Sequence, residues 1–269
     1  MVSVDPLVVT EAALQVKRRG WQPLYVPLAS KNPGRDGWQR ERLTEEQLPT
    51  IFSQGGNLSI VTGDPSGGLT DIDLDAPEAL ACADDYLPPT GMVHGRPSKP
   101  NSHRWYVASP VPRVTQWRDT EGSMLVELRG TGGHTLIPPS IHPEGETLDW
   151  VHQDTPAQVD SATLQTACAR IAATSLLTRH WPAKGSRHNA ALAVAGFLLR
   201  GGLDSELAAR LVETAARVAR NEEWQARAGM FEIRPETWGR GNQSPACQPW
   251  PDCSRTEKES PQSCGIGSH

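Results

Sequence analysis

The sequence predicts an α+β fold, in which a mixed-sheet catalytic core is followed by a small all-helical domain. Two observations lead to this prediction. Between residues 8 and 152, short alternating or apolar runs are separated by segments rich in Pro and Gly, which is typical of short strands mixed with a few helices. From about residue 162 the chain becomes rich in Ala and Leu and looks helical. The predicted divisions are residues 1–158, residues 162–240 and a polar tail at 241–269.

The individual elements follow from local signals. Residues 8–19 predict the first helix, because Gly20 follows a basic last turn, a common end of a helix. In the second part, Asp204 is placed to cap the last helix. Strands are expected at 22–28, 58–62, 67–75, 103–107, 124–128, 134–138 and 147–152, and helices at 77–86, 162–177, 189–199 and 204–220.

The composition excludes several classes of protein. The formal net charge of −5 gives no overall basic character, so any binding of nucleic acid must come from local patches. No apolar stretch approaches the ~20 residues of a membrane span, and residues 1–19 lack the pattern of a secretory signal. The five cysteines are scattered and odd in number, which favours a reducing compartment. We therefore expect a cytoplasmic protein with no membrane partner.

The run Gly67–Asp75 carries the strongest chemical signal. Polar and apolar residues alternate in it, so Asp71, Asp73 and Asp75 are expected on one face of a strand. Carboxylates held so close repel one another and are costly to bury. A divalent cation would relieve both costs, and Mg²⁺ and Mn²⁺ prefer oxygen ligands, with substrate phosphates completing the shell. The run therefore predicts a Mg²⁺ or Mn²⁺ site.

The alternative interpretation of this run is a solvated acidic strand face. Two neighbouring features weigh against it, because the apolar segment Ile60–Gly63 precedes the run and a Gly67-Gly68 turn leads into it. Both favour an inner strand of a sheet over an edge strand.

A second segment, Arg96–Tyr106, joins a basic loop to a strand. Ser102 and His103 open the strand, and Arg96 and Lys99 lie just before them. Arg and Lys supply charge while Ser and His supply directed hydrogen bonds, which together can hold a triphosphate. A lone His is more often structural, but its place after a basic loop favours a nucleotide-binding role here.

A third segment, Val126–Thr135, combines charge with glycine. Glu127 is a lone carboxylate in an apolar strand and could complete a metal site, and Arg129 shares its face at i+2. The glycines that follow allow the backbone to approach a ligand closely. The alternatives are a surface ion pair for Glu127 and Arg129 and a hairpin turn for the glycines.

Together and in this order, the three segments resemble the bifunctional DNA primase/polymerase (Prim-Pol) family of plasmids and phages, within the archaeo-eukaryotic primase superfamily. The resemblance covers about residues 8–152, and residues 185–203 are similar to the small helical domain that often follows this core. It is carried by Gly20–Pro23, Lys31–Pro33, Gly37-Trp38, Gly56–Gly63, Ser66–Leu69, the Asp run, Ser102-His103, Arg129–Gly133 and Pro138–Pro143.

The resemblance implies a nucleotidyltransferase. Such an enzyme synthesises primers on single-stranded DNA and extends them from dNTPs or NTPs, by two-metal catalysis with Mg²⁺ or Mn²⁺, during plasmid or phage replication. The site residues that it implies are Asp73, Asp75 and Glu127 as metal ligands and catalytic residues, Asp71 as a further metal candidate, His103 as catalytic and nucleotide-binding, and Ser102, Arg96, Lys99 and Arg129 as nucleotide-binding.

Template binding is expected from local basic and aromatic residues. No Gly-rich loop ending in Gly-Lys-Ser/Thr is present, so a replicative helicase is expected to be a separate partner. The predicted DNA-binding residues are Arg104, Trp105, Arg187 and His188, with Arg96, Lys99, Arg113, Trp117, Arg118 and Lys184 as further candidates.

Two other functions fit part of the sequence. A metal-dependent nuclease would use a similar acidic cluster but needs no triphosphate site. A replication-initiation module without catalysis would bind DNA through a decayed site, and the complete set Asp73, Asp75, His103 and Glu127 argues against decay.

The tail offers Cys247, Cys253, Cys264 and His269, the ligand types of Zn²⁺. Their spacing is irregular and lacks a Cys-x2-Cys pair, which argues against zinc. The polar composition instead predicts a disordered segment.

Overall fold

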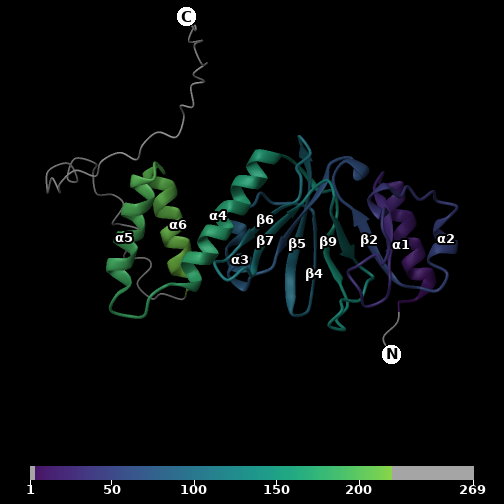
Figure 1. Cartoon of the computed structure of the whole chain (residues 1–269), viewed down its shortest axis with the longest axis horizontal. Coiled ribbons are helices and arrows are strands. Elements are labelled where there is room, and N and C mark those ends of the chain that lie inside the picture. The colour runs from purple at the N-terminus through teal and green to yellow at the C-terminus, as the bar shows by residue number, and fades with distance from the viewer. Residues whose placement is uncertain (1–3, 220–269) are drawn as a thin grey trace, which may run out of the picture. The chain divides into compact units, whose positions relative to one another are not determined.

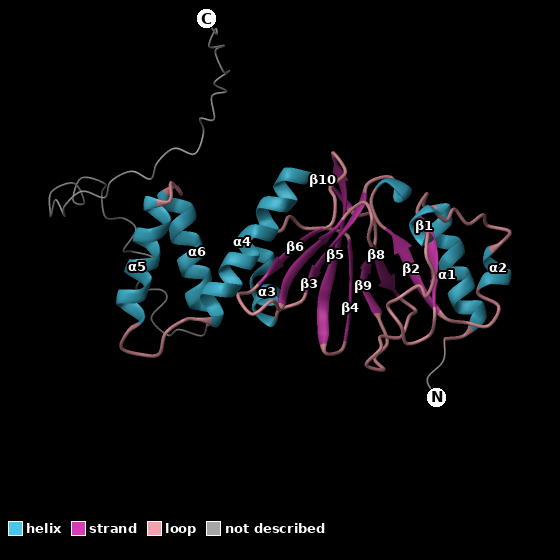
Figure 2. Cartoon of the chain, in the orientation of Figure 1, coloured by secondary structure: helices cyan, strands magenta, loops and turns pink. Residues whose placement is uncertain are grey.

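The computed structural model describes residues 4–219, which belong to the first of two compact units, 1–232. The predicted tail, its candidate zinc ligands and residues 220–240 lie outside the described residues. Within them, two β-sheets are combined with a helical region at the C-terminal side, so the predicted α+β fold class is confirmed (Figures 1 and 2).

The larger sheet carries most of the strands. All its neighbouring strands pair antiparallel except β10, which runs parallel to β5 and makes the sheet mixed, as predicted. β3 lies between β7 and β5, so the Asp run is on an inner strand. The order is β6 (Thr115–Arg118), β7 (Met124–Arg129), β3 (Leu69–Leu74), β5 (Lys99–Ser109), β4 (Met92–Arg96) and β9 (Asp149–Gln153), with β10 (Ala157–Asp160) beside β5.

The smaller sheet contains β1 (Gln22–Val26), β2 (Asn57–Val61) and β8 (His134–Ile137), in that order and antiparallel. β7 and β8 therefore lie in different sheets, although only a short glycine-rich segment joins them. The hairpin-turn interpretation of that segment is wrong. Thr131 of this segment packs against Gly63, which follows β2 and has φ 80°. A Cβ atom on Gly63 would lie 2.3 Å from the backbone nitrogen of Thr131.

Three of the described helices begin at aspartate caps. Asp5, Asp160 and Asp204 each accept backbone N–H groups of the first turn, which satisfies donors that have no partner inside the helix. The helices are α1 (Pro6–Arg18), α2 (Leu48–Ile51), α3 (Pro77–Cys82), α4 (Ser161–Arg179), α5 (Arg187–Arg200) and α6 (Ser205–Val218).

The two faces of the larger sheet have different partners. We call the face that carries Asp73 the front and the face that carries Ile72 the back, since neighbouring residues of a strand point to opposite sides. Against the front pack α1, α2 and the smaller sheet, in a buried cluster that includes Leu69 and Trp105 of the larger sheet. Figure 1 shows α1 and α2 beside β2, on the other side of the larger sheet from α3 and α4.

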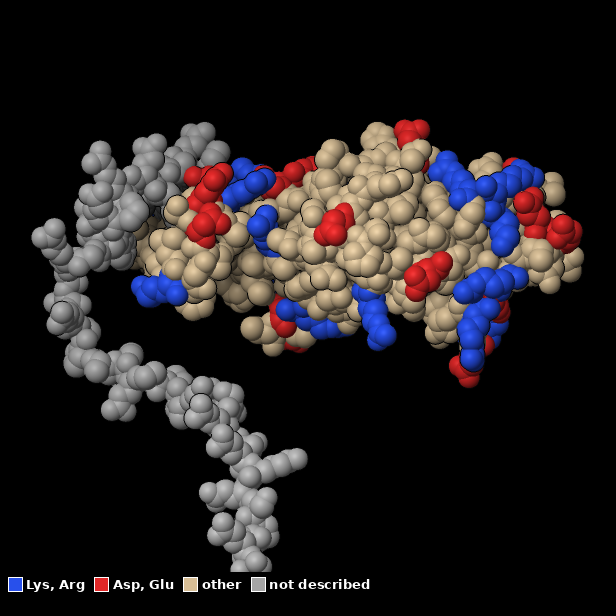
Figure 3. All heavy atoms as spheres, turned by 90° about the horizontal axis from the view of Figure 1, so that it is seen from above, with Lys and Arg blue, Asp and Glu red and all other residues tan. Residues whose placement is uncertain are grey.

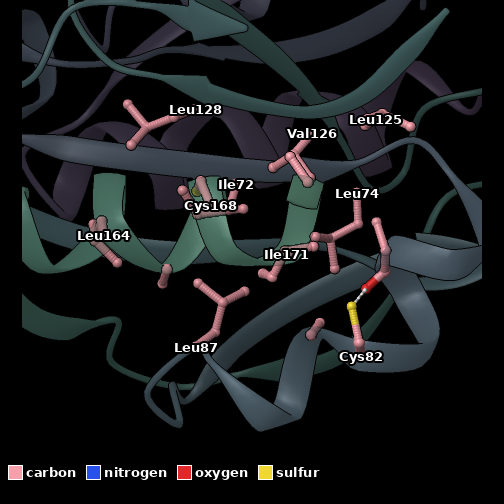
Figure 4. Close-up of a cluster of buried hydrophobic side chains, with 14 of the residues drawn as sticks. Ile72, Leu74, Cys82, Leu87, Leu125, Val126, Leu128, Leu164, Cys168 and Ile171 are labelled. Carbon is pink, nitrogen blue, oxygen red and sulfur yellow. Dashed lines mark hydrogen bonds between the residues drawn. The ribbon is translucent and has the colours of Figure 1, made fainter. Parts of the chain in front are cut away.

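The back of the sheet is covered by α3 and α4. Leu164, Cys168 and Ile171 of α4 are buried in one cluster with Ile72 and with other strand residues (Figure 4). The change in composition near Asp160 therefore marks a change from strands to helices, while the hydrophobic core continues from the sheet into α4. The predicted helical domain at 162–240 would begin with α4, and this helix also completes the core of the sheet.

Cys82 and Cys168 are buried free thiols in this back cluster. Burial raises the pKa of each thiol to about 12, so both are protonated at neutral pH and act as small apolar residues. None of the helices within residues 4–219 combines the length and the apolar character needed to cross a membrane.

The packing of α4 leads to a prediction about stability. Leu164→Ala should lower the free energy of unfolding by about 2–5 kcal/mol, because it leaves a cavity between α4 and the sheet. Gln165→Ala, at the next and exposed position of α4, should have almost no effect. Chemical denaturation of the full chain measures both. Equal small changes would mean that α4 does not belong to the core.

Candidate active site

A row of polar side chains crosses the front of the larger sheet. In the strand register, Asp73 of β3 lies opposite Glu127 of β7 on one side and His103 of β5 on the other. The row continues to Gln116 of β6 and to His94 of β4. Directly opposite residues of antiparallel strands share a face and lie close together. The three sequence segments that carry the chemistry therefore meet on one surface.

Asp73, Glu127 and His103 of this row line a pocket of about 320 Å³. The larger sheet supplies the acidic residues and most cations, and β8, the loop between β1 and α2 and segments that join the strands supply the rest of the lining. Asp71 does not line the pocket, whereas the other two residues of the Asp run do. The lining is Lys31, Trp38, Asp73, Asp75, Arg96, Lys99, Ser102, His103, Val114, Glu127, Arg129, Gly132, Gly133, His134, Leu136, His142 and Leu148.

Arg129 is the cation at the centre of the acidic group. Its Nη2 donates to Asp73 Oδ2 at 2.5 Å and its Nε donates to Glu127 Oε2 at 2.7 Å, while Nη1 lies 3.6 Å from Asp71 Oδ2. Burial opposes its charge, but these carboxylates raise the pKa of Arg129 above its ordinary value. The Arg129 side chain is only 18% exposed, so the interpretation as a surface ion pair is wrong.

Asp71 and Asp73 are both buried, which excludes the solvated acidic strand. Asp71 Oδ2 accepts from Thr135 Oγ1 at 2.8 Å and pairs with His103 Nδ1 at 2.9 Å, and its other oxygen has no hydrogen-bond partner among the described residues. His103 Nε2 then lies 3.7 Å from Asp73 Oδ1. Asp71 thus fixes the orientation of the imidazole that faces Asp73.

The charge states of this group are coupled. Burial opposes ionisation of Asp73, but the positive charges of His103 and Arg129 hold its pKa below the usual value. Burial likewise opposes protonation of His103, but Asp73 and Asp71 raise its pKa above the ordinary value. His103 therefore favours the imidazolium form, with the N–H on Nδ1 toward Asp71 and the N–H on Nε2 on the side of Asp73.

A second imidazole supports the first. The rings of His94 and His103 are stacked at 4.4 Å with an interplanar angle of 7°. His94 Nδ1 accepts from the indole N–H of Trp105 at 2.9 Å, so its proton is on Nε2, which lies 3.0 Å from the carbonyl oxygen of Leu136. Burial and the neighbouring His103 lower the pKa of His94 well below its ordinary value, so His94 stays neutral.

Asp75 follows directly after β3, at the edge of the pocket. Burial and the neighbouring charge of Asp73 raise its pKa, against the opposing effect of Lys99. Lys99 Nζ donates to Asp75 Oδ1 at 3.1 Å. The two carboxylates are therefore close enough to repel each other, as the sequence predicts for this run.

The predicted phosphate-binding cations already have partners. Arg96 forms ion pairs with Glu144 and Glu146, and Lys99 forms one with Asp75. Arg96 and Lys99 nevertheless line the pocket together with Ser102. The structure brings this predicted set together, and its role in binding nucleotide stays a prediction.

Four predicted DNA-binding residues lie away from the pocket. Trp105 is fully buried and bonded to His94, so it offers no face to a base, and its prediction as a DNA-binding residue is wrong. Arg104 is on the back of the sheet, where it pairs with Asp84. Arg187 and His188 are in α5, which packs on α6. On the face drawn in Figure 3, acidic side chains are interspersed among the basic ones.

The candidates Arg113, Trp117 and Arg118 lie at or beside β6. Arg113 and Arg118 are exposed there, while Trp117 is partly buried against the back cluster. Their role in template binding stays a prediction, as does that of Lys184, which lies between α4 and α5.

Sequence reasoning assigned no role to several residues at the site. Lys31, Trp38, His134 and His142 line the pocket, and His94 lies behind His103. Lys31, Trp38 and His142 lie in segments that carry the family resemblance, which was the available signal, and His134 directly follows one of them. His94 lies in a strand that was not predicted, so no pattern indicated it.

The carboxylates are held by cations of the chain itself. Within residues 4–219, no three His, Cys, Asp or Glu side chains are arranged as a ready metal-binding group. This agrees with the geometry, because Arg129 occupies oxygens of Asp73 and Glu127 while Lys99 occupies one of Asp75.

The role of Arg129 leads to a prediction about stability. Arg129→Met should lower the free energy of unfolding by about 3–5 kcal/mol, because it leaves buried carboxylates without a counter-charge. Arg113→Met, at an exposed position with no ion pair among the described residues, is the matched control and should have little effect. A loss below about 1 kcal/mol, measured by chemical denaturation, would contradict a central role for Arg129.

His134 leads to a prediction about pH. Burial, with the nearby Arg129, lowers its pKa from 6.5 to about 4. A histidine with a lowered pKa binds its proton more weakly when folded, so it reduces stability as the pH falls from about 6.5 to about 4. Wild type should therefore lose stability relative to His134→Asn over this range. A constant difference between the two proteins would contradict the lowered pKa, which NMR titration of the ring checks directly.

The comparison with known families agrees with this arrangement. Residues 13–162, more than half of the 269, match the family described as "Bifunctional DNA primase/polymerase, N-terminal". Comparison with curated proteins finds no match. The matched segment begins in α1, ends in the first turn of α4 and contains every strand of both sheets. The chain therefore belongs to the bifunctional DNA primase/polymerase family.

Proposed function

We propose that the chain copies single-stranded DNA, making primers and extending them by transfer of a nucleotidyl group to a 3′-hydroxyl. Membership in the primase/polymerase family supports this activity in general. The observation that carries the proposal is the convergence of Asp73, Glu127 and His103 from three strands on one pocket, which is also lined by cations. Acidic residues beside cations fit a site for a metal-bound nucleoside triphosphate.

The donor chemistry at the pocket fits Mg²⁺ or Mn²⁺. Asp73, Asp75 and Glu127 present carboxylate oxygens, and the pKa of Asp75 is raised by burial and by Asp73, a repulsion that a cation would relieve. We propose these three as the ligands of two metal ions. When bound, the metal would supply a more acidic attacking hydroxyl and would neutralise charge on the phosphates. Arg129 would then give up part of its bonding to Asp73 and Glu127.

The other residues would bind and orient the nucleotide. Arg96 and Lys99 place positive charge at the pocket wall beside Ser102, where the β- and γ-phosphates would lie. His103 is held by Asp71 and stacked on neutral His94, which fixes its ring at the pocket with Nε2 on the side of Asp73. A fixed imidazolium would stabilise charge that develops on the leaving pyrophosphate.

Several finer expectations belong to the same proposal. We expect the protein to act in plasmid or phage replication, in the cytoplasm, beside a separately encoded helicase. We also expect the helical region, with Arg187 and His188, to assist initiation, because holding two free nucleotides on a template costs more entropy than extending a primer. A truncation that tests this must retain α4, which completes the sheet core.

A synthesis assay tests the proposal. The protein is incubated with unprimed or primed single-stranded DNA, labelled nucleotides and Mg²⁺ or Mn²⁺, and the products are sized. New strands with release of pyrophosphate support the proposal. Shortened template without pyrophosphate would indicate a nuclease, and DNA binding without any product would indicate an initiation module.

The assignment of the acidic residues leads to a further prediction. Asp73→Asn or Asp75→Asn should reduce synthesis by at least about 10²-fold, because each removes a charge on which the reaction depends. Asp71→Asn should be milder, since Asp71 is outside the pocket and acts through His103. Asp154→Asn, at an exposed position, is the matched control. An equal loss in the Asp71 and Asp73 variants would mean that the ligand pair has been misassigned.

A further inference from the structure

The loop that joins β1 to α2, residues 27–47, contributes two side chains to the pocket. These are Lys31 and Trp38, and neither comes from the larger sheet that carries the acidic residues. The loop lies on the smaller-sheet side of the molecule, where Figure 2 labels β1 and α2. The β1–α2 loop therefore forms a part of the pocket lining that is separate from the sheet with the acidic group.

Lys31 differs from the other cations of the pocket. Arg96, Lys99 and Arg129 are each paired with carboxylates, whereas no described residue pairs with the Lys31 ammonium. The charge of Lys31 nevertheless acts on the site, because it adds to those of His103 and Arg129 in lowering the pKa of Asp73 against the effect of burial. Lys31 therefore keeps its three N–H donors available for an anionic ligand in this pocket.

The loop is held in place within the chain. Arg35 donates to Glu41 through two nitrogens, at 2.5 and 2.6 Å, and also to the carbonyl oxygen of Tyr25 at 3.1 Å. Asn57 donates to the carbonyl oxygen of Ser30 at 3.2 Å, next to Lys31. A loop that is already fixed loses little entropy when a ligand binds, so its contacts contribute more fully to affinity.

Trp38 and His134 form an uncharged wall of the pocket. Their rings meet edge to face, with centroids 4.7 Å apart and an interplanar angle of 79°. His134 Nδ1 is bonded to Ser59 Oγ at 2.9 Å, and its lowered pKa keeps it neutral. Leu136, Leu148 and Val114 continue this wall. A neutral aromatic and apolar wall suits a flat base and not a phosphate group.

We propose that the β1–α2 loop binds the incoming nucleoside triphosphate at both of its ends, with the Lys31 ammonium on the phosphates and with Trp38, beside His134, against the base. This assignment rests on the proposed function and adds residues that would hold the nucleotide from outside the sheet that carries the acidic row. It also explains why a single loop contributes both a cation and an aromatic ring, since the two ends of one nucleotide need different chemistry.

Equilibrium binding without DNA tests the assignment. A fluorescently labelled dATP is the probe, and unlabelled dATP and inorganic triphosphate are the competitors. The second competitor has the phosphates but no base, so it separates the two contacts. The variants are Lys31→Gln, Trp38→Leu and Trp38→Phe. The control is Arg40→Gln, which removes an exposed charge from the same loop outside the pocket.

Each variant has its own expected pattern. Lys31→Gln should weaken both competitors about tenfold or more, because it removes a charge-assisted hydrogen bond to phosphate. Trp38→Leu should weaken dATP about fivefold to tenfold and leave inorganic triphosphate unchanged, as expected for lost contact with a base. Trp38→Phe should restore most of the affinity for dATP, and Arg40→Gln should bind as wild type does.

Other results would overturn the assignment. Unchanged binding of both competitors to Lys31→Gln would remove Lys31 from the site, and an equal loss of both competitors in Trp38→Leu would mean that Trp38 only supports the loop. A wild-type chain that binds dATP but makes no product would overturn the proposed function and leave this assignment standing. A wild-type chain that binds neither competitor would overturn both.

Discussion

The arrangement of the site depends on one buried cation. Arg129 contacts Asp73 and Glu127 directly and lies near Asp71, so a single guanidinium compensates acidic side chains from two neighbouring strands. Carboxylates packed so closely in a largely buried place would otherwise repel one another or take up protons. The planar guanidinium has five N–H donors and keeps its charge under all ordinary conditions, which suits it to this position better than a lysine. The same bonds give the acidic group a fixed geometry before any ligand arrives.

The alternation of β3 explains how so polar a site can lie inside a stable fold. Asp71 and Asp73 point to the front, while Ile72 and Leu74 point to the back and join the cluster that α4 completes. The strand thus contributes to the core and to the site at once. Polar groups of the front are paired with one another, as in the chain from Thr135 through Asp71 Oδ2 to His103, while Asp71 Oδ1 has no hydrogen-bond partner among the described residues. This pairing stabilises the buried carboxylates, because an unpaired charge at this depth is costly.

The pocket itself lies between two layers, and each layer contributes a different chemistry. The larger sheet supplies carboxylates and paired cations, and the smaller sheet with its loop supplies Lys31, Trp38 and neutral His134. The formal net charge of the chain, −5, does not prevent such a site, since the cations are gathered locally at the pocket. Recognition of an anion depends on the electrostatic field inside the pocket and not on the net charge of the molecule.

Local pattern in the sequence determined the α+β class, most helices and strands, and the three segments that meet at the site, because period-two alternation, caps and glycines act over a few residues. It missed β4, β6, β10 and α2, which are short and rely on neighbours for their pairing. It also placed Trp105 on a DNA-binding surface, although this residue is buried against His94. Only the tertiary structure decided that Arg129 is shared among carboxylates, that α4 belongs to the sheet core, and that Lys31 reaches the pocket. Each of these features depends on contacts between residues far apart in the chain. Strand register and the packing of the layers determine such contacts, and a local sequence pattern does not show them.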